Sequence, residues 1–235
     1  MKLPVLTSGR ILRRYKRFLA DVELTDGALV TAHVPNTGSM AGCWTPGARV
    51  QLSWSSNPSR KLPWTLERVD MGGGWIGVNT ARPNGVIAEG IGNGRIPALD
   101  GYPELRREVA FAAGRHRGRL DIRLSGGPQS DALVEVKNVT LLDGDRIRFP
   151  DAVSERGRKH LELLLAAVGA GWRGVILFAV NRPEGAVFAP AWRIDPRYCE
   201  RLRQVAAAGV EVLAVRIRHT AEGIEVGDCL PTDLS

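Results

Sequence analysis

A continuous apolar run constrains the fold of this chain more than any other feature. Residues 175–180 carry no polar side chain, which is typical of a central strand that is buried on both faces of a sheet. Residues 196–208 predict a helix that ends at Gly209, and residues 210–215 predict a further parallel strand. This alternation predicts an α/β domain with a mixed sheet over residues 82–235.

A second strand carries charge within apolar surroundings. In residues 133–139 the charged Glu135 and Lys137 alternate with valines, so both side chains point to the same side of the strand. Upstream, Asp121 lies in the strand-like run 119–124, and the turn-rich residues between the two runs predict antiparallel neighbours. The three charged side chains are therefore expected to lie close together.

Two carboxylates and an ammonium group on adjacent strands predict a site for a divalent metal and a water molecule. Asp121 and Glu135 are the expected Mg²⁺ ligands, with the carbonyl of Val136 as a further oxygen, and Lys137 would orient or deprotonate the water. The alternative is an ordinary ion-pair group on an exposed strand face. Charges among buried apolar residues favour the catalytic interpretation.

The composition favours a polyanionic partner. The net charge is +7, which suits nucleic acid because phosphate contacts come mostly from Arg and Lys. An Arg-rich, Ala-rich and Gly-rich chain is also what a GC-rich genome produces. No apolar run reaches the length of about 18 residues that a membrane span needs. The three scattered cysteines indicate a reduced, cytoplasmic protein.

Residues 1–81 predict a separate, all-β domain. Five short strand patterns separated by turn signals suggest a small β-barrel, and the oligonucleotide-binding (OB) type is the expected form. The predicted strands are 19–24, 28–34, 49–54, 64–69 and 75–78. The loop 35–40 between two of them could accept a phosphate or be an ordinary turn.

Basic and aromatic residues are interleaved in two parts of the barrel, and basic residues cluster on one helix of the second domain. In the barrel they could stack bases and follow a phosphate backbone, or the tryptophans could be core and the cations solvated. In the helix predicted after a cap at Asp151 or Ser154 they could hold a phosphate or form a solvated face. The candidate nucleic-acid-binding residues are Arg14, Lys16, Arg17, Arg60, Lys61 and Trp64 in the barrel and Arg156, Lys159 and His160 in the helix.

The second domain resembles a known nuclease core. Its predicted order is helix, three strands, helix, strand, helix, strand, with Asp121 on the second strand and Glu135-x-Lys137 on the third. This order is similar to the restriction-endonuclease-like PD-(D/E)XK core, although Leu120 replaces the proline of the motif. The resemblance implies Mg²⁺ as the cofactor and Glu108 as an additional acidic metal ligand.

Several longer segments resemble the sugar fermentation stimulation protein (SfsA) family. They are Arg14-Tyr15-Lys16-Arg17-Phe18, residues 33–40, 60–65 and 78–80, the strand with Thr140 (133–140), and 149–157. The resemblance covers nearly the whole chain. It implies a bacterial or archaeal DNA-binding protein with an OB-like domain followed by a nuclease-like domain.

Two functions follow from these features, and a third has little to support it. The first is a Mg²⁺-dependent nuclease that hydrolyses phosphodiester bonds. The second is a catalytically silent DNA-binding regulator linked to sugar metabolism genes. An enzyme or sensor for small molecules ranks last, because no nucleotide-cofactor fingerprint is present. The expected partner is DNA, with a single strand and a homodimer both left open.

Overall fold

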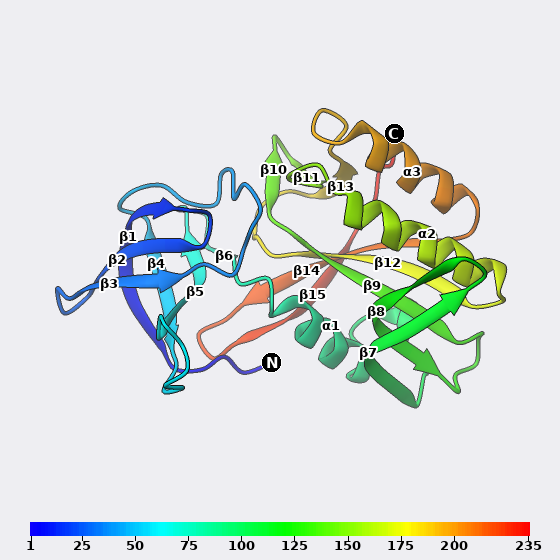
Figure 1. Cartoon of the computed structure of the whole chain (residues 1–235), viewed down its shortest axis with the longest axis horizontal. Helices are drawn as coiled ribbons and strands as arrows, with labels where there is room; N and C mark the ends of the chain where they lie inside the picture. Colours follow the sequence, from blue (N-terminus) through cyan, green and yellow to red (C-terminus); the bar gives the residue numbers. More distant parts are fainter.

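Five strands form a barrel in the computed structural model, which describes residues 1–235, and a sixth strand pairs only with the fifth (Figure 1). The barrel closes because β3 pairs in parallel with β5, His33 lying opposite Thr65. Alternate residues of β2 point inward, so Ala20 and Val22 are fully buried in a core of 14 residues. The strands are β1 (Leu6–Tyr15), β2 (Leu19–Leu24), β3 (Leu29–His33), β4 (Arg49–Trp54), β5 (Trp64–Asp70) and β6 (Trp75–Gly77).

The barrel confirms the predicted OB-like domain but contains a strand that the sequence pattern did not indicate. In β1 only Gly9 and Ile11 are buried, and arginines occupy much of the rest, so the strand has no clear apolar alternation. It forms because both of its edges are paired, with β2 on one side and β4 on the other. Pairing with neighbours, rather than its own pattern, makes this segment a strand.

The second domain is a six-stranded mixed sheet with helices on both faces, in the order β15-β14-β12-β9-β8-β7. Helix α1 (Pro83–Gly92) packs on one face, and α2 (Glu155–Gly169) and α3 (Pro196–Ala207) pack on the other. The sheet strands are β7 (Glu104–Ala113), β8 (His116–Ser125), β9 (Ala132–Val139), β12 (Arg173–Val180), β14 (Glu211–His219) and β15 (Ile224–Leu230).

The apolar run is the central strand, as predicted. In β12 every residue after Arg173 is buried, and the strand pairs in parallel with both β9 and β14. The sequence did not indicate the antiparallel edge strand β15, nor the short sheet of β10 (Leu141–Asp143), β11 (Arg146–Phe149) and β13 (Val187–Pro190). These strands are short or partly exposed, so their patterns are weak.

Side-chain caps begin the two longer helices. The hydroxyl of Ser154 accepts the N–H of Gly157 at the start of α2, and Asp195 accepts the N–H of Tyr198 at the start of α3. Asp151, the other predicted cap of α2, has a different role. Its Oδ2 accepts the N–H of Ser39 from the barrel, 3.1 Å away, so it connects the two domains.

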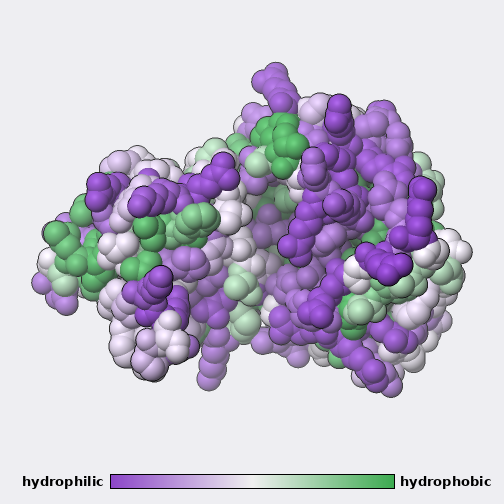
Figure 2. Space-filling view, in the orientation of Figure 1, coloured by the Kyte–Doolittle hydropathy of each residue, from purple (hydrophilic) through white to green (hydrophobic).

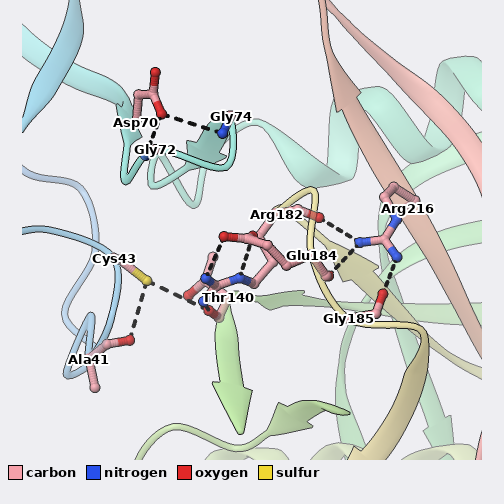
Figure 3. A network of polar contacts seen from close by, with 10 residues as sticks. All are labelled: Ala41, Cys43, Asp70, Gly72, Gly74, Thr140, Arg182, Glu184, Gly185 and Arg216. Carbon is pink, nitrogen blue, oxygen red and sulfur yellow. Dashed lines mark hydrogen bonds and ion pairs between the residues drawn. The ribbon is translucent and has the colours of Figure 1, made fainter. Parts of the chain in front are cut away.

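The loop after β12 fixes the barrel to the second domain (Figure 3). The buried Arg182 donates to the carbonyl of Thr140 at 2.7 Å, and the Cys43 thiol of the barrel contacts the same oxygen. Arg216 holds the loop from the other side through its contacts with the Arg182 and Glu184 carbonyls. Because these contacts are buried, the two domains have a defined relative position.

The junction between the domains falls between Gly77, where β6 ends, and Pro83, where α1 begins. The first residues of the chain lie away from the barrel, however. Met1 and Leu3 pack against the core of the second domain, and Lys2 pairs with Gly223. None of the helices is long and apolar enough to span a bilayer.

Candidate active site at the splayed strands

The ladder between β8 and β9 ends just where the predicted site begins. Its last pair is Ile122 with Val134, and beyond it the Asp121 side chain takes the place of a backbone acceptor. Asp121 Oδ2 accepts the N–H of Val136 at 2.7 Å, and Oδ1 accepts the side-chain amide of Asn84 at 2.6 Å. The two strands therefore separate at this point, and the carboxylate is held in the gap.

Glu135 lies beside Asp121 and is almost fully buried, with 3% of its surface exposed. Its Oε1 accepts Lys137 Nζ at 2.5 Å and also contacts Nδ1 of His160. Lys137 Nζ is 3.1 Å from the same His160 nitrogen. Arg156, one turn earlier on α2, lies with its Nε 3.5 Å from His160 Nε2, so the imidazole has Glu135 and Lys137 at Nδ1 and a guanidinium at Nε2.

The two carboxylates have opposite pKa shifts. Burial, followed by the nearby charge of Glu135, raises the pKa of Asp121 to about 6. Burial also acts to raise the pKa of Glu135, but the hydrogen bond from His160 and the charge of Lys137 outweigh it and lower that pKa. Glu135 is therefore firmly ionised, whereas Asp121 becomes ionised only as the pH approaches neutrality.

The donor set fits a divalent cation. Glu135 Oε2 is buried and has no hydrogen-bond partner, although a buried carboxylate oxygen normally has one. It lies on the carboxylate whose charge raises the pKa of Asp121, so a cation here would relieve both the missing contact and the repulsion. No group of three or more His, Cys, Asp or Glu side chains is arranged to hold a metal, so water and phosphate oxygens would complete a Mg²⁺ shell.

The predicted third acidic ligand is not gathered with the other two. Glu108 lies opposite Asp121 in the β7–β8 register, between the pairs of Arg107 with Ile122 and of Val109 with Leu120. Its φ of 54° interrupts the regular strand, its side chain is exposed, and no hydrogen bond or ion pair joins it to the site. Its role as a metal ligand stays a prediction.

The predicted nucleic-acid-binding residues of the barrel differ in their surroundings. Arg14 donates to the carbonyls of Arg17, Asn36 and Gly38, so its guanidinium shapes the loop at 36–39 instead of facing solvent. Lys16 and Arg17 are exposed in the β1–β2 turn, where both have positive φ. A contact with nucleic acid remains a prediction for all of them.

The other predicted nucleic-acid-binding residues of the barrel, at positions 60–64, also differ in their exposure. Arg60 donates to the hydroxyl of Thr65 at 2.7 Å, whereas Lys61 is exposed. Trp64 is half-buried and packs against the barrel core, which matches the structural alternative for this residue. Trp54, its partner across the strands, is 55% exposed.

On α2, Arg156 and Lys159 are exposed, while His160 is directed to the carboxylate cluster. Sequence reasoning placed His160 with the basic face of the helix, because helical spacing says nothing about a neighbouring strand. It missed Asn84 altogether, since an amide in the first turn of a helix carries no signal of its own. Only the packing of α1 beside β8 brings Asn84 to Asp121.

The folds of the two domains define a class: an OB barrel joined to a restriction-endonuclease-like domain. Comparison with known families agrees, because residues 12–78 match the SfsA N-terminal OB domain and residues 81–223 match the sugar fermentation stimulation protein RE domain. The chain belongs to the sugar fermentation stimulation protein (SfsA) family, and the resemblance seen in the sequence is confirmed.

Relatives align over the full chain. A sugar fermentation stimulation protein homolog of Geobacter metallireducens is 50% identical over 235 residues, with all of both chains covered. A homolog of Acidithiobacillus ferrooxidans is 48% identical over 98% of this chain and 99% of its own. The structure of Pyrococcus furiosus SfsA in complex with Ca²⁺ is 26% identical, has a TM-score of 0.86, and covers 99% of this chain and 98% of that one.

Proposed function

We propose that this protein is a metal-dependent nuclease that hydrolyses phosphodiester bonds in DNA. One observation carries the proposal: two buried carboxylates and a lysine meet where β8 and β9 separate, and Glu135 Oε2 is left without a partner. A buried, ionised oxygen without a hydrogen bond costs stability. Its retention is explained if the oxygen serves as a ligand.

Asp121 and Glu135 are the side chains that would hold Mg²⁺. When bound there, a metal ion would supply Lewis-acid chemistry, polarising the phosphoryl group and lowering the pKa of a bound water molecule. Asn84 and the N–H of Val136 fix the orientation of the Asp121 carboxylate through two hydrogen bonds. Lys137, whose ammonium group contacts Glu135, is the cation that would direct a water molecule or neutralise charge on the phosphate. The Ca²⁺ complex of the Pyrococcus furiosus relative supports a divalent ion, since Ca²⁺ and Mg²⁺ both take oxygen ligands.

DNA as the substrate is supported by charge. The chain carries 32 Lys and Arg against 25 Asp and Glu, and the turn at Lys16 and Arg17 and the α2 residues Arg156 and Lys159 expose cations. Such cations contact phosphates without reading sequence. This arrangement suits an enzyme that acts on the backbone.

A cleavage assay tests the proposal. Single- and double-stranded DNA and RNA are incubated with Mg²⁺, Mn²⁺ or chelator, and wild type is compared with Asp121→Asn and Lys137→Ala. We expect metal-dependent cleavage that falls by about 10²–10⁴-fold in either variant, the size of effect seen when an acid–base group is removed, while DNA binding is retained. Cleavage at wild-type rates in both variants would show that the site is not catalytic.

A catalytically silent DNA-binding protein is the second candidate. One observation favours it: Lys137 and His160 both contact Glu135 Oε1, so this carboxylate is compensated without a metal. The same assay distinguishes the two functions. DNA binding that needs no metal and weakens steeply with salt, together with no cleavage by wild type, would identify a binder.

A further inference from the structure

A polar cleft lies between the barrel and the second domain, beside the proposed active site. It has a volume of about 430 Å³ and is bounded by the barrel loop that contains Asn36 and Thr37, by the loop 148–154, and by the end of β9. Figure 2 shows the surface hollowed between the two domains, with hydrophilic residues gathered on the side of the second domain. The contacts across the domain junction, from Ser39 to Asp151 and from Cys43 to Thr140, hold both walls in place, so the cleft exists before any ligand binds.

Four lining residues have side-chain donors that no protein group satisfies. Arg17 and Thr37 are exposed and make no side-chain hydrogen bond. Asn138 accepts from Asn181 through Oδ1 at 2.6 Å, which leaves its amide N–H groups free, and the hydroxyl of Thr140 has no partner either. These donors come from both domains and line one space, which is the arrangement expected of a binding site.

The charges of the cleft favour an anionic ligand. Arg17 is a cation without an acidic partner, at a turn where its φ of 65° turns the chain sharply. The one carboxylate in the lining, Asp151, accepts the N–H of Ser39. It also lies near Arg14, whose pKa is lowered by burial and by the charge of Arg17, an effect that the charge of Asp151 partly offsets. Asp151 is therefore partly compensated, and Arg17 remains available to a phosphate.

The cleft is continuous with the catalytic strand. Val139, which lies on the same side of β9 as Glu135 and Lys137, belongs to the lining, and a strand rises about 3.3 Å per residue. Val139 is thus about 7 Å from Lys137 along the strand, which is about the spacing between neighbouring phosphates of a single strand. A strand whose phosphate is at Lys137 would reach the cleft with its next nucleotide.

We propose that this cleft binds one nucleotide of a single strand, adjacent to the phosphate that is cleaved. The proposal rests on the proposed nuclease function and adds to it the form of the substrate. A volume of about 430 Å³ falls in the range of small-ligand sites, roughly 300–1,000 Å³. A site of this size encloses one nucleotide, and the two strands of a duplex would not enter it together.

Binding of labelled oligonucleotides to the full-length protein tests the proposal. Fluorescence anisotropy is measured in chelator for single strands of DNA and RNA and for the DNA duplex. Thr37→Glu, which adds a negative charge at the cleft, should weaken single-strand binding at least about fivefold. Arg17→Ala should weaken it and make the slope of log K against log salt shallower by about 1. Both residues are exposed, so folding should be unaffected.

Two variants serve as matched controls. Thr25→Glu adds the same charge to an exposed turn at the far end of the barrel, and Arg197→Ala removes an exposed arginine on α3; both should bind as wild type does. A single strand with a photoreactive thiothymidine beside the cleavage position should crosslink to residues 35–38 or 148–154.

The outcomes separate this inference from the nuclease proposal. If wild type cleaves DNA but the two cleft variants bind like their controls, the cleft assignment is overturned and the nuclease function stands. Preferred binding of the duplex, or crosslinks only to the barrel loop at 55–63, would overturn it as well. If wild type neither binds nor cleaves any of the probes, both proposals fail.

Discussion

Glu67 and Glu135 are both buried carboxylates on strands, each only 3% exposed, but their surroundings differ. Glu67 Oε1 accepts hydrogen bonds from Ser53 and Arg82. Its Oε2 accepts hydrogen bonds from Asn79 and from the same arginine, and all four are within 3.0 Å. We name Glu67, Arg82, Ser53 and Asn79 the closed cluster. Glu135 has contacts on Oε1 alone, and Oε2 has none. We name Asp121, Glu135, Lys137 and His160 the open cluster.

The difference shows how a buried charge serves structure or chemistry. In the closed cluster the bonds from Arg82, Ser53 and Asn79 outweigh the effect of burial and lower the pKa of Glu67, so the charge is satisfied inside the protein. In the open cluster an oxygen remains unsatisfied and the pKa of Asp121 is raised to about 6. Perturbed groups of this kind mark sites where a ligand completes the arrangement.

Removing the arginine of the closed cluster should have the largest effect on stability. Arg82→Ala leaves Glu67 buried without its cation, and such a change costs about 3–5 kcal/mol. Urea unfolding measures it. The double variant Glu67→Gln, Arg82→Ala should recover part of the loss because no charge is then left buried. A loss below about 1 kcal/mol in Arg82→Ala would contradict the structural role of this cluster.

Removing a charge from the open cluster should raise the free energy of unfolding instead of lowering it. The folded pKa of Asp121, about 6, lies above its ordinary value of 3.8, so stability is lost as pH rises from about 4 through 6. Asp121→Asn cannot ionise and should be more stable than wild type at pH 7 in chelator, by about 3 kcal/mol. The gain should vanish near pH 4. Thermal unfolding at both pH values measures it, and an equal difference at both would exclude this cause.

A histidine near the closed cluster allows a test of the domain junction. Burial, followed by the charge of Arg68, lowers the pKa of His219 to about 4 from 6.5, so stability present above pH 6.5 is lost as pH falls toward 4. His219→Gln should remove this part of the loss, worth about 2 kcal/mol at pH 5. Urea unfolding of both proteins at pH 7 and pH 5 checks it. Parallel losses in the two proteins would assign the pH effect to other groups.

The smallest effect should come from the group that orients Glu135. His160 contacts Glu135 Oε1, so His160→Ala should weaken Mn²⁺ or Ca²⁺ binding about tenfold, as loss of a ligand's outer hydrogen bond does. His160→Gln, which can donate the same bond, should restore part of the affinity. Calorimetric titration measures both, with Arg197→Ala as the control. Unchanged affinity in His160→Ala would show that Glu135 needs no such support.

Much of the fold followed from local patterns. The apolar run before Asn181 is the central strand β12, and the periodic segments after Ser154 and Asp195 are α2 and α3. The period of two put Glu135 and Lys137 on one side of β9, and the turn-rich linker made β8 its antiparallel neighbour. These features depend on residues that are close in sequence, so the sequence alone determined them, and with them the grouping of Asp121, Glu135 and Lys137.

Other features depend on residues that are far apart, and only the tertiary structure decided them. β1 is a strand because β2 and β4 pair with it, and Asn84 reaches Asp121 across 37 positions. The end of the β8–β9 ladder, the unpartnered oxygen of Glu135 and the cleft between the domains all arise from packing. A pattern of residue types specifies which faces are buried, but it does not specify which buried polar atom is left without a partner.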